Sequence, residues 1–114
     1  MVYFVRAKSY FRYATDILNE LKTEKNQEAI IKKAQEVFKL GLKAVWAISQ
    51  VTPPEKPPTL EEILNSTLPS FEGFSNRVLE IKKQLFEKSV SPEEAKALAE
   101  EFLKIVETVL SPIL

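Results

Sequence analysis

The segment IIKKAQEVFKLGLKAVWAI, residues 30–48, decides the fold class, because its apolar side chains recur at the spacing of an α-helix. Its polar side chains fall on the opposite face, and this two-sided pattern predicts an amphipathic helix with one face buried. Gly41 lies within the apolar stripe, although a glycine inside a helix costs about 1 kcal/mol relative to alanine. We therefore expect a neighbouring helix to approach closely there. The apolar face contains Ile30, Ala34, Val37, Phe38, Gly41, Val45 and Ile48, and the polar face contains Lys32, Glu36, Lys39 and Lys43.

Residues 2–21 repeat this spacing and predict a long first helix. Its apolar residues spread widely around the helix, Phe4, Phe11 and Tyr13 among them, and this spread predicts a homodimer. The main stripe contains Tyr3, Ala7, Tyr10, Ala14, Ile17 and Leu21, with Phe4, Phe11 and Leu18 beside it.

Proline and capping residues place the elements that follow. The stretch VTPPEKPPT at residues 51–59 cannot continue a helix, because each proline lacks an amide donor, and it predicts a stiff connector. Thr59 and Glu62 form a capping-box pattern that begins a short helix at residues 60–68. Ser70 is the candidate cap of a fourth helix, which we expect to reach residue 88.

The clearest helix start is SPEE at residues 91–94, where Ser91 is the cap, Pro92 takes the first helical position and Glu94 completes a capping box. A fifth helix follows and ends at the Ser111–Pro112 break. The sequence shows no strand pattern and no internal repeat. It therefore predicts a single domain, residues 1–114, with an all-α fold: an antiparallel helical bundle of about five helices.

The chain contains neither cysteine nor histidine. Disulfides, thiol catalysis and thiolate zinc sites are excluded, and the commonest general base and zinc ligand are missing. We therefore expect no metal and no cofactor. Paired carboxylates such as Glu93 and Glu94 are typical of the first turn of a helix, where the helix dipole favours negative charge.

Lys and Arg number 16, as do Asp and Glu, which argues against bulk charge attraction to nucleic acid. The charges are unevenly distributed: residues 1–51 carry nine basic and five acidic residues, and residues 52–114 carry seven and eleven, so the halves have net charges of +4 and −4. The start of the chain lacks the pattern of a signal peptide, and no run approaches the roughly 20 apolar residues of a membrane span. We expect a cytoplasmic protein that does not contact a membrane.

Three stretches resemble the HEPN domain, named for higher eukaryotic and prokaryotic nucleotide-binding proteins. They are KKAQEVFKLGLKAVWAI at residues 32–48, LEEIL at residues 60–64 after the proline connector, and AKALAEEFLKIVETVL at residues 95–110. With the aromatic-rich first helix, the similarity covers essentially the whole chain. The resemblance implies a helical bundle that often forms homodimers and works in toxin–antitoxin or defence systems. Some members are metal-independent ribonucleases, and others act beside a nucleotidyltransferase partner.

The ribonuclease members carry an arginine followed four to six residues later by a histidine. In FSNRVLEIKK, residues 74–83, Arg77 occupies the place of that arginine, but no histidine follows it. In-line attack on a phosphate needs a proton acceptor with a near-neutral pKa as well as a cation, and Arg77 supplies only the cation. Two interpretations remain open. Arg77 grips a phosphate or a partner's carboxylate in a dimer cleft, or it is an edge residue whose stem covers apolar surface or which pairs with a glutamate.

Lys32, Lys39 and Lys43 align on the polar face of the second helix, with Trp46 at its border. A basic strip beside an aromatic side chain suits a single-stranded nucleic acid. Alternation with acidic residues such as Glu36 equally suits a solvated face, with ion pairs of about 0.2–0.5 kcal/mol each. Trp46 has a further interpretation, in which it packs under the proline connector or in a subunit interface.

The residues and the resemblance together predict a non-catalytic HEPN-like binding module, homodimeric, that binds a protein partner such as a nucleotidyltransferase, or a nucleotide or RNA. Two alternatives remain. One is a HEPN-type ribonuclease or toxin that uses Arg77 with an unconventional base, and the other is a structural assembly protein without a ligand. The candidate ligand-binding residues are Arg77, Lys39, Lys43 and Trp46.

Overall fold

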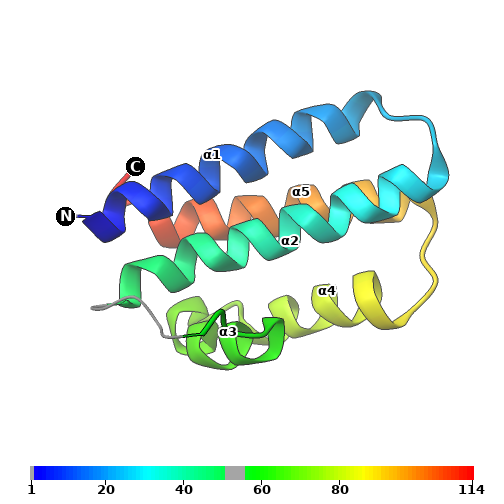
Figure 1. Ribbon diagram of the computed structural model, residues 1–114. Helices are drawn as coiled ribbons and strands as arrows, with labels where there is room; N and C mark the ends of the chain where they lie inside the picture. The colour runs from blue at the N-terminus through cyan, green and yellow to red at the C-terminus, as the bar shows by residue number, and fades with distance from the viewer. Residues whose placement is uncertain (1, 51–55) are drawn as a thin grey trace.

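The computed structural model describes residues 2–50 and 56–114, with the side chains of residues 2 and 3 outside this description. It contains five α-helices and one short 3-10 helix: α1 (Val2–Thr23), α2 (Gln27–Ser49), α3 (Leu60–Thr67), η1 (Leu68–Phe71), α4 (Ser75–Glu87) and α5 (Pro92–Leu110). The four longer helices, α1, α2, α4 and α5, alternate in direction along the bundle (Figure 1). The predicted all-α helical bundle is confirmed.

Helix α2 is the central element, since α1, α3, α4 and α5 all pack against it. Three aromatic side chains, from α2, η1 and α5, pack together near the middle of α2. The Phe38 ring on α2 lies with its centroid 4.3 Å from that of Phe102 on α5, and Phe71 of η1 lies 6.0 Å from Phe102. All three are fully buried. The stripe predicted for α2 is buried, except Ile48 at its end, which is half-buried.

Gly41 is the point of closest approach between α2 and α5. A Cβ atom added at this glycine would lie 2.9 Å from Cε2 of Phe102 and 3.2 Å from Cγ2 of Val106. Real Cβ atoms do not approach ring carbons at the first of these distances, so only glycine lets the two helices pack at this separation. The close approach predicted at Gly41 is confirmed.

The predicted caps of α3 and α5 are also confirmed. The Thr59 hydroxyl accepts from the Glu62 amide at 3.2 Å, and the Glu62 carboxylate accepts from the Thr59 amide at 3.0 Å, which completes a capping box. The Ser91 hydroxyl accepts from the Glu94 amide at 3.2 Å, with Pro92 in the first turn. Among the described hydrogen bonds, Glu94 does not return one to Ser91. This second capping box is therefore only half formed.

The prediction that Ser70 caps the fourth helix is wrong. The chain continues from α3 directly into η1, where Pro69 is tolerated because the first turn of a helix leaves its amide positions without partners. Gly73 then turns the backbone at a φ of 86°, a conformation that favours glycine, and α4 begins at Ser75. Ser70 is thus inside a 3-10 turn rather than before a helix.

The apolar stripe predicted on α1 is buried toward its centre and exposed at its edges. Ala7, Ala14, Leu18 and Leu21 are buried, whereas Phe4 is 41% exposed and Tyr13 is 56% exposed. The side chain of Tyr3 lies outside the described residues, as do residues 51–55 of the predicted proline connector. In the described part of the chain, no helix has the length and apolar character needed to cross a membrane.

Candidate functional site

Arg77 forms the closest ion pair between α4 and α5. Its Nε donates to Oε2 of Glu101 at 2.5 Å, and its Nη2 donates to Oε1 at 2.6 Å, so the pair is bidentate. The hydrogen bonds from Arg77 lower the pKa of Glu101, and Glu101 in turn raises the pKa of Arg77. Both side chains remain more than a third exposed. Of the two interpretations of Arg77, the geometry matches the arginine that pairs with a glutamate.

A solvent-open hollow of about 260 Å³ adjoins this ion pair. Glu101 is the one carboxylate among the residues that line it, and both of its oxygens accept hydrogen bonds from Arg77. A general base works best with a pKa near the operating pH, whereas the pKa of Glu101 is moved downward, away from neutrality. The hollow is lined by Phe74, Arg77, Glu101, Lys104, Ile105 and Thr108.

Lys39, Lys43 and Trp46 lie along one side of α2, at the i, i+4 and i+7 positions. The Lys39 Nζ atom lies 5.9 Å from the centroid of the Phe86 ring on α4, within the range of a cation–π contact. Lys43 is half-buried, and Trp46 is half-buried with its ring packed against the core. The structure therefore brings these three predicted residues together, with Trp46 acting partly as a packing residue.

Arg77 is not part of this group. On α4, Phe86 faces α2 and Arg77 faces α5. The two positions are separated by nine residues, about two and a half helical turns, which places them on opposite flanks of α4. The four candidate ligand-binding residues consequently belong to two separate surfaces.

A carboxylate-free region at one end of the α1–α2 pair was missed by our reading of the sequence. Residues 2–15 and 37–50 contain five basic residues and no Asp or Glu. Since α1 and α2 are antiparallel neighbours, the start of α1 lies beside the end of α2 (Figure 1). The five basic residues are Arg6, Lys8, Arg12, Lys39 and Lys43. Counting charges along the sequence reveals both stretches, but only the antiparallel packing of α1 on α2 places them side by side.

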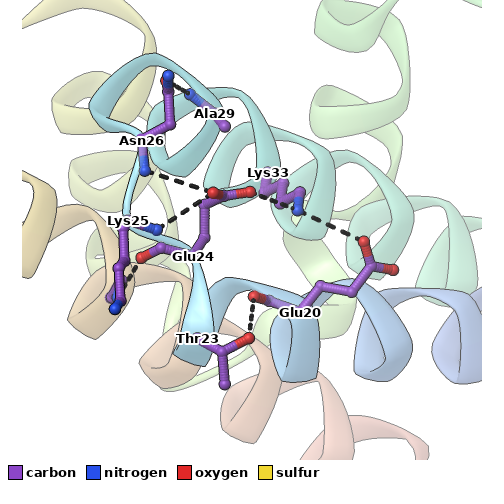
Figure 2. A network of polar contacts seen from close by, with 8 residues as sticks. Glu20, Thr23, Glu24, Lys25, Asn26, Ala29 and Lys33 are labelled. Carbon is purple, nitrogen blue, oxygen red and sulfur yellow. Dashed lines mark hydrogen bonds and ion pairs between the residues drawn. The ribbon is translucent and has the colours of Figure 1, made fainter.

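The α1–α2 turn, at the other end of this pair, uses its charges for structure. Lys33 on α2 donates to Oε1 of Glu24 at 2.8 Å and lies 3.5 Å from Glu20 on α1 (Figure 2). The second carboxylate oxygen of Glu24 accepts from the amides of Lys25 and Asn26, at 3.1 and 3.3 Å. These hydrogen bonds, led by the one from Lys33, hold the pKa of Glu24 below its ordinary value of 4.5.

Helices α4 and α5 are tied to this half of the hairpin by two long-range hydrogen bonds. Lys96 on α5 donates to the backbone carbonyl of Glu24 at 3.1 Å. Gln35 on α2 donates to the carbonyl of Leu85 on α4 at 2.8 Å. The turn end of the α1–α2 pair is therefore anchored to both of the later long helices.

The seam between α1 and α2 is hollowed beside Lys33. An open cavity of about 380 Å³ is lined by Ile17 and Glu20 on α1 and by Lys32, Lys33 and Glu36 on α2. Ile17 is the one apolar residue of this lining, and the other four carry charges of both signs. Within the described residues, no group of three or more Asp or Glu side chains is arranged to hold a metal ion.

Comparison with known proteins adds no relative: no family model, no curated protein and no solved structure matches this chain. The site is therefore interpreted from its own residues.

Proposed function

We propose that this chain is a non-catalytic, HEPN-like helical binding module that forms a homodimer and binds a protein partner such as a nucleotidyltransferase, or a nucleotide or RNA. The observation that supports it is the carboxylate-free end of the α1–α2 pair, where Lys39, Lys43 and Trp46 lie on one side of α2. Cations beside an aromatic side chain suit an anionic ligand.

The state of Arg77 argues against catalysis at this residue. Its two hydrogen bonds to Glu101 already occupy the fork that a phosphate would need. A ribonuclease mechanism with Arg77 requires this ion pair to open and a proton acceptor to enter from elsewhere.

The exposed apolar side chains of α1 support the dimer. Phe4, Val5 and Tyr13 are 41%, 64% and 56% exposed. Val5 and Tyr13 lie within about 80° of each other around α1, whereas Phe4, nine residues from Tyr13, lies on the opposite flank, so the dimer surface is the one that contains Val5 and Tyr13. We expect light scattering to report twice the mass of the chain at tens of micromolar. A monodisperse monomer would remove the dimer from the proposal.

Binding is tested by titrating the protein with short single-stranded RNA and with a panel of nucleotides at two salt concentrations, following Trp46 fluorescence. We expect a fluorescence change that weakens as salt rises, because cationic surfaces release counterions when they bind nucleic acid. Lys43→Glu should abolish the change, whereas Lys25→Glu, an exposed change near the α1–α2 turn, should not.

The two alternatives predict different results. A ribonuclease would cleave RNA, and Arg77→Ala would abolish the cleavage. A purely structural assembly protein would show no increase in Tm with any ligand. A binder at 100 times its Kd gains about 2.7 kcal/mol of stability.

A further inference from the structure

We propose that the α1–α2 seam docks an acidic amphipathic helix of a protein partner, with the acidic end of that helix at the carboxylate-free end of the seam. This inference rests on the proposed binding function and names the surface and the chemistry of the protein partner. It is carried by the charges, the apolar side chains and the shape of the seam.

The geometry of the seam follows from its ion pairs. Lys33 on α2 forms an ion pair with Glu20 on α1 across the seam. Positions seven residues apart on a helix lie about two turns apart on the same face. Seven residues before Glu20 on α1 is Tyr13, and seven residues after Lys33 on α2 is Leu40, so these two positions lie across from each other. A second step of seven residues along each helix places Arg6 across from Ala47. Lys43 lies on the α2 side of the same strip, seven residues beyond Glu36 of the seam cavity.

The charges of the seam are segregated along its length. Arg6 and Lys43 form no ion pair among the described residues, and no carboxylate of α1 or α2 lies within their half of the seam. Glu36 is about 10 Å away from Lys43 along α2, from the helical rise. The other half, around the cavity, carries both signs and is internally paired through Lys33. An acidic group is therefore attracted to one end only, which sets the direction of a bound helix.

The side chains along the seam favour a peptide over a nucleic acid as the ligand. Tyr13 is 56% exposed, and Ile17 and Leu40 are half-buried, so these three present partial apolar surfaces along the seam. A single strand stacks its successive bases on several aromatic faces, whereas Tyr13 is the one aromatic side chain among these three. Aliphatic side chains of an amphipathic helix need only a shallow apolar groove.

The length and depth of the seam also suit a helix. Arg6 and Glu20 are separated by about 21 Å along α1, from the rise per residue, and this is about four turns of a partner helix. The cavity of about 380 Å³ at Ile17 offers space for an apolar side chain at the far end. A partner with leucine on one face and glutamate concentrated toward one end matches both features.

The test uses the full chain and a fluorescein-labelled helical peptide of leucine and glutamate, followed by fluorescence polarisation. We expect salt-sensitive binding, and we expect Arg6→Glu and Lys43→Glu each to weaken it by roughly tenfold, since like charges across an interface are costly. Arg12→Glu is the matched control, because Arg12 is exposed on the same helix and its position, six residues from Arg6, lies about 120° away from Arg6 around the helix. It should leave the affinity within about twofold, as expected for a charge outside the interface.

Four results would overturn the proposal: no binding of the peptide, equal binding of a peptide with lysine in place of glutamate, an equal loss with Arg12→Glu, or oligouridylate binding at Arg6 and Lys43 in preference to the peptide. Circular dichroism checks that each variant is folded, and Arg6→Gln serves if charge reversal disturbs α1. Dimer formation and the nucleotide titration are measured on the same protein. If they succeed while the peptide fails, the seam proposal fails alone and the proposed function stands.

Discussion

At the α1–α2 turn, Lys33 donates to Glu24 at 2.8 Å and Lys96 donates to the carbonyl of the same residue at 3.1 Å. At the other end of the same helix pair, Arg6 and Lys43 have no ion-pair partner among the described residues. The two ends share one hydrophobic core and differ in how their polar side chains are used. Charges at the turn join helices through ion pairs and hydrogen bonds, whereas no ion pair in the described part of the chain joins helices through Arg6 or Lys43.

The largest expected effect comes from the core that both ends share. Phe102→Ala should lower the free energy of unfolding by about 3–5 kcal/mol, as for other buried phenylalanines, because it removes the ring that contacts Phe38 and Phe71. Urea denaturation measures the loss, and native-state hydrogen exchange should show it at both ends of α2. Phe4→Ala, at an exposed position, should cost far less. Loss of protection at only one end would mean that the two ends unfold independently.

The next effect is confined to the turn end. The Asn26 side chain caps α2 by accepting from the Ala29 amide at 3.0 Å. Asn26→Ala should cost about 1 kcal/mol, the usual cost of losing an N-cap. Gln27→Ala, one residue further and exposed, is the control for thermal denaturation. Peptide binding at Arg6 and Lys43 should be unaffected, and a matching loss of affinity would contradict the separation of the two ends.

A smaller, pH-dependent effect should appear at Glu24. Its folded-state pKa lies below the ordinary value of 4.5, so its stabilising contribution is present above pH 4.5 and is lost as the pH falls through the lowered pKa. We expect Glu24→Gln to be less stable than the unmodified chain at neutral pH, and the difference to shrink in acid. Urea midpoints across this pH range measure it. Glu107→Gln, at an exposed position without an ion pair among the described residues, is the control variant.

The smallest effect on stability belongs to the open end. Lys43→Glu should change the free energy of unfolding by no more than about 0.5 kcal/mol, as surface substitutions usually do, because no ion pair is lost there. Differential scanning calorimetry provides the measurement. A loss of several degrees in Tm would show that Lys43 supports the fold, and the contrast between the two ends would disappear.

Much of the fold could be predicted, because helix formation depends on residues close together in the chain. The apolar period located all five helices, and the caps at Thr59 and Ser91 were visible as short patterns. The packing role of Gly41 could be inferred from its position in an apolar stripe. The prediction at Ser70 was wrong because the residues around it resemble a helix cap but form a 3-10 turn. Gly73 then turns the chain before α4 begins.

The candidate site was less predictable. The partner of Arg77 is Glu101, 24 residues further along the chain, and only the packing of α4 on α5 brings them together. The interaction of Lys39 with Phe86 likewise joins two helices. Helical spacing correctly grouped Lys39, Lys43 and Trp46, which share one helix. It contained no information that Arg77, on α4, faces α5 rather than α2.

By itself, the sequence determined where the helices form, which face of each is buried and which halves of α1 and α2 lack carboxylates. These properties follow from side-chain period, capping and composition, all of which act locally. Only the tertiary structure decided which charges are neutralised and which remain open. Antiparallel packing of α1 on α2 brings Glu20 and Glu24 to Lys33 while it gathers Arg6 and Lys43 at the opposite end. Electrostatic pairing depends on distances of a few ångströms between helices, and no local pattern sets those distances.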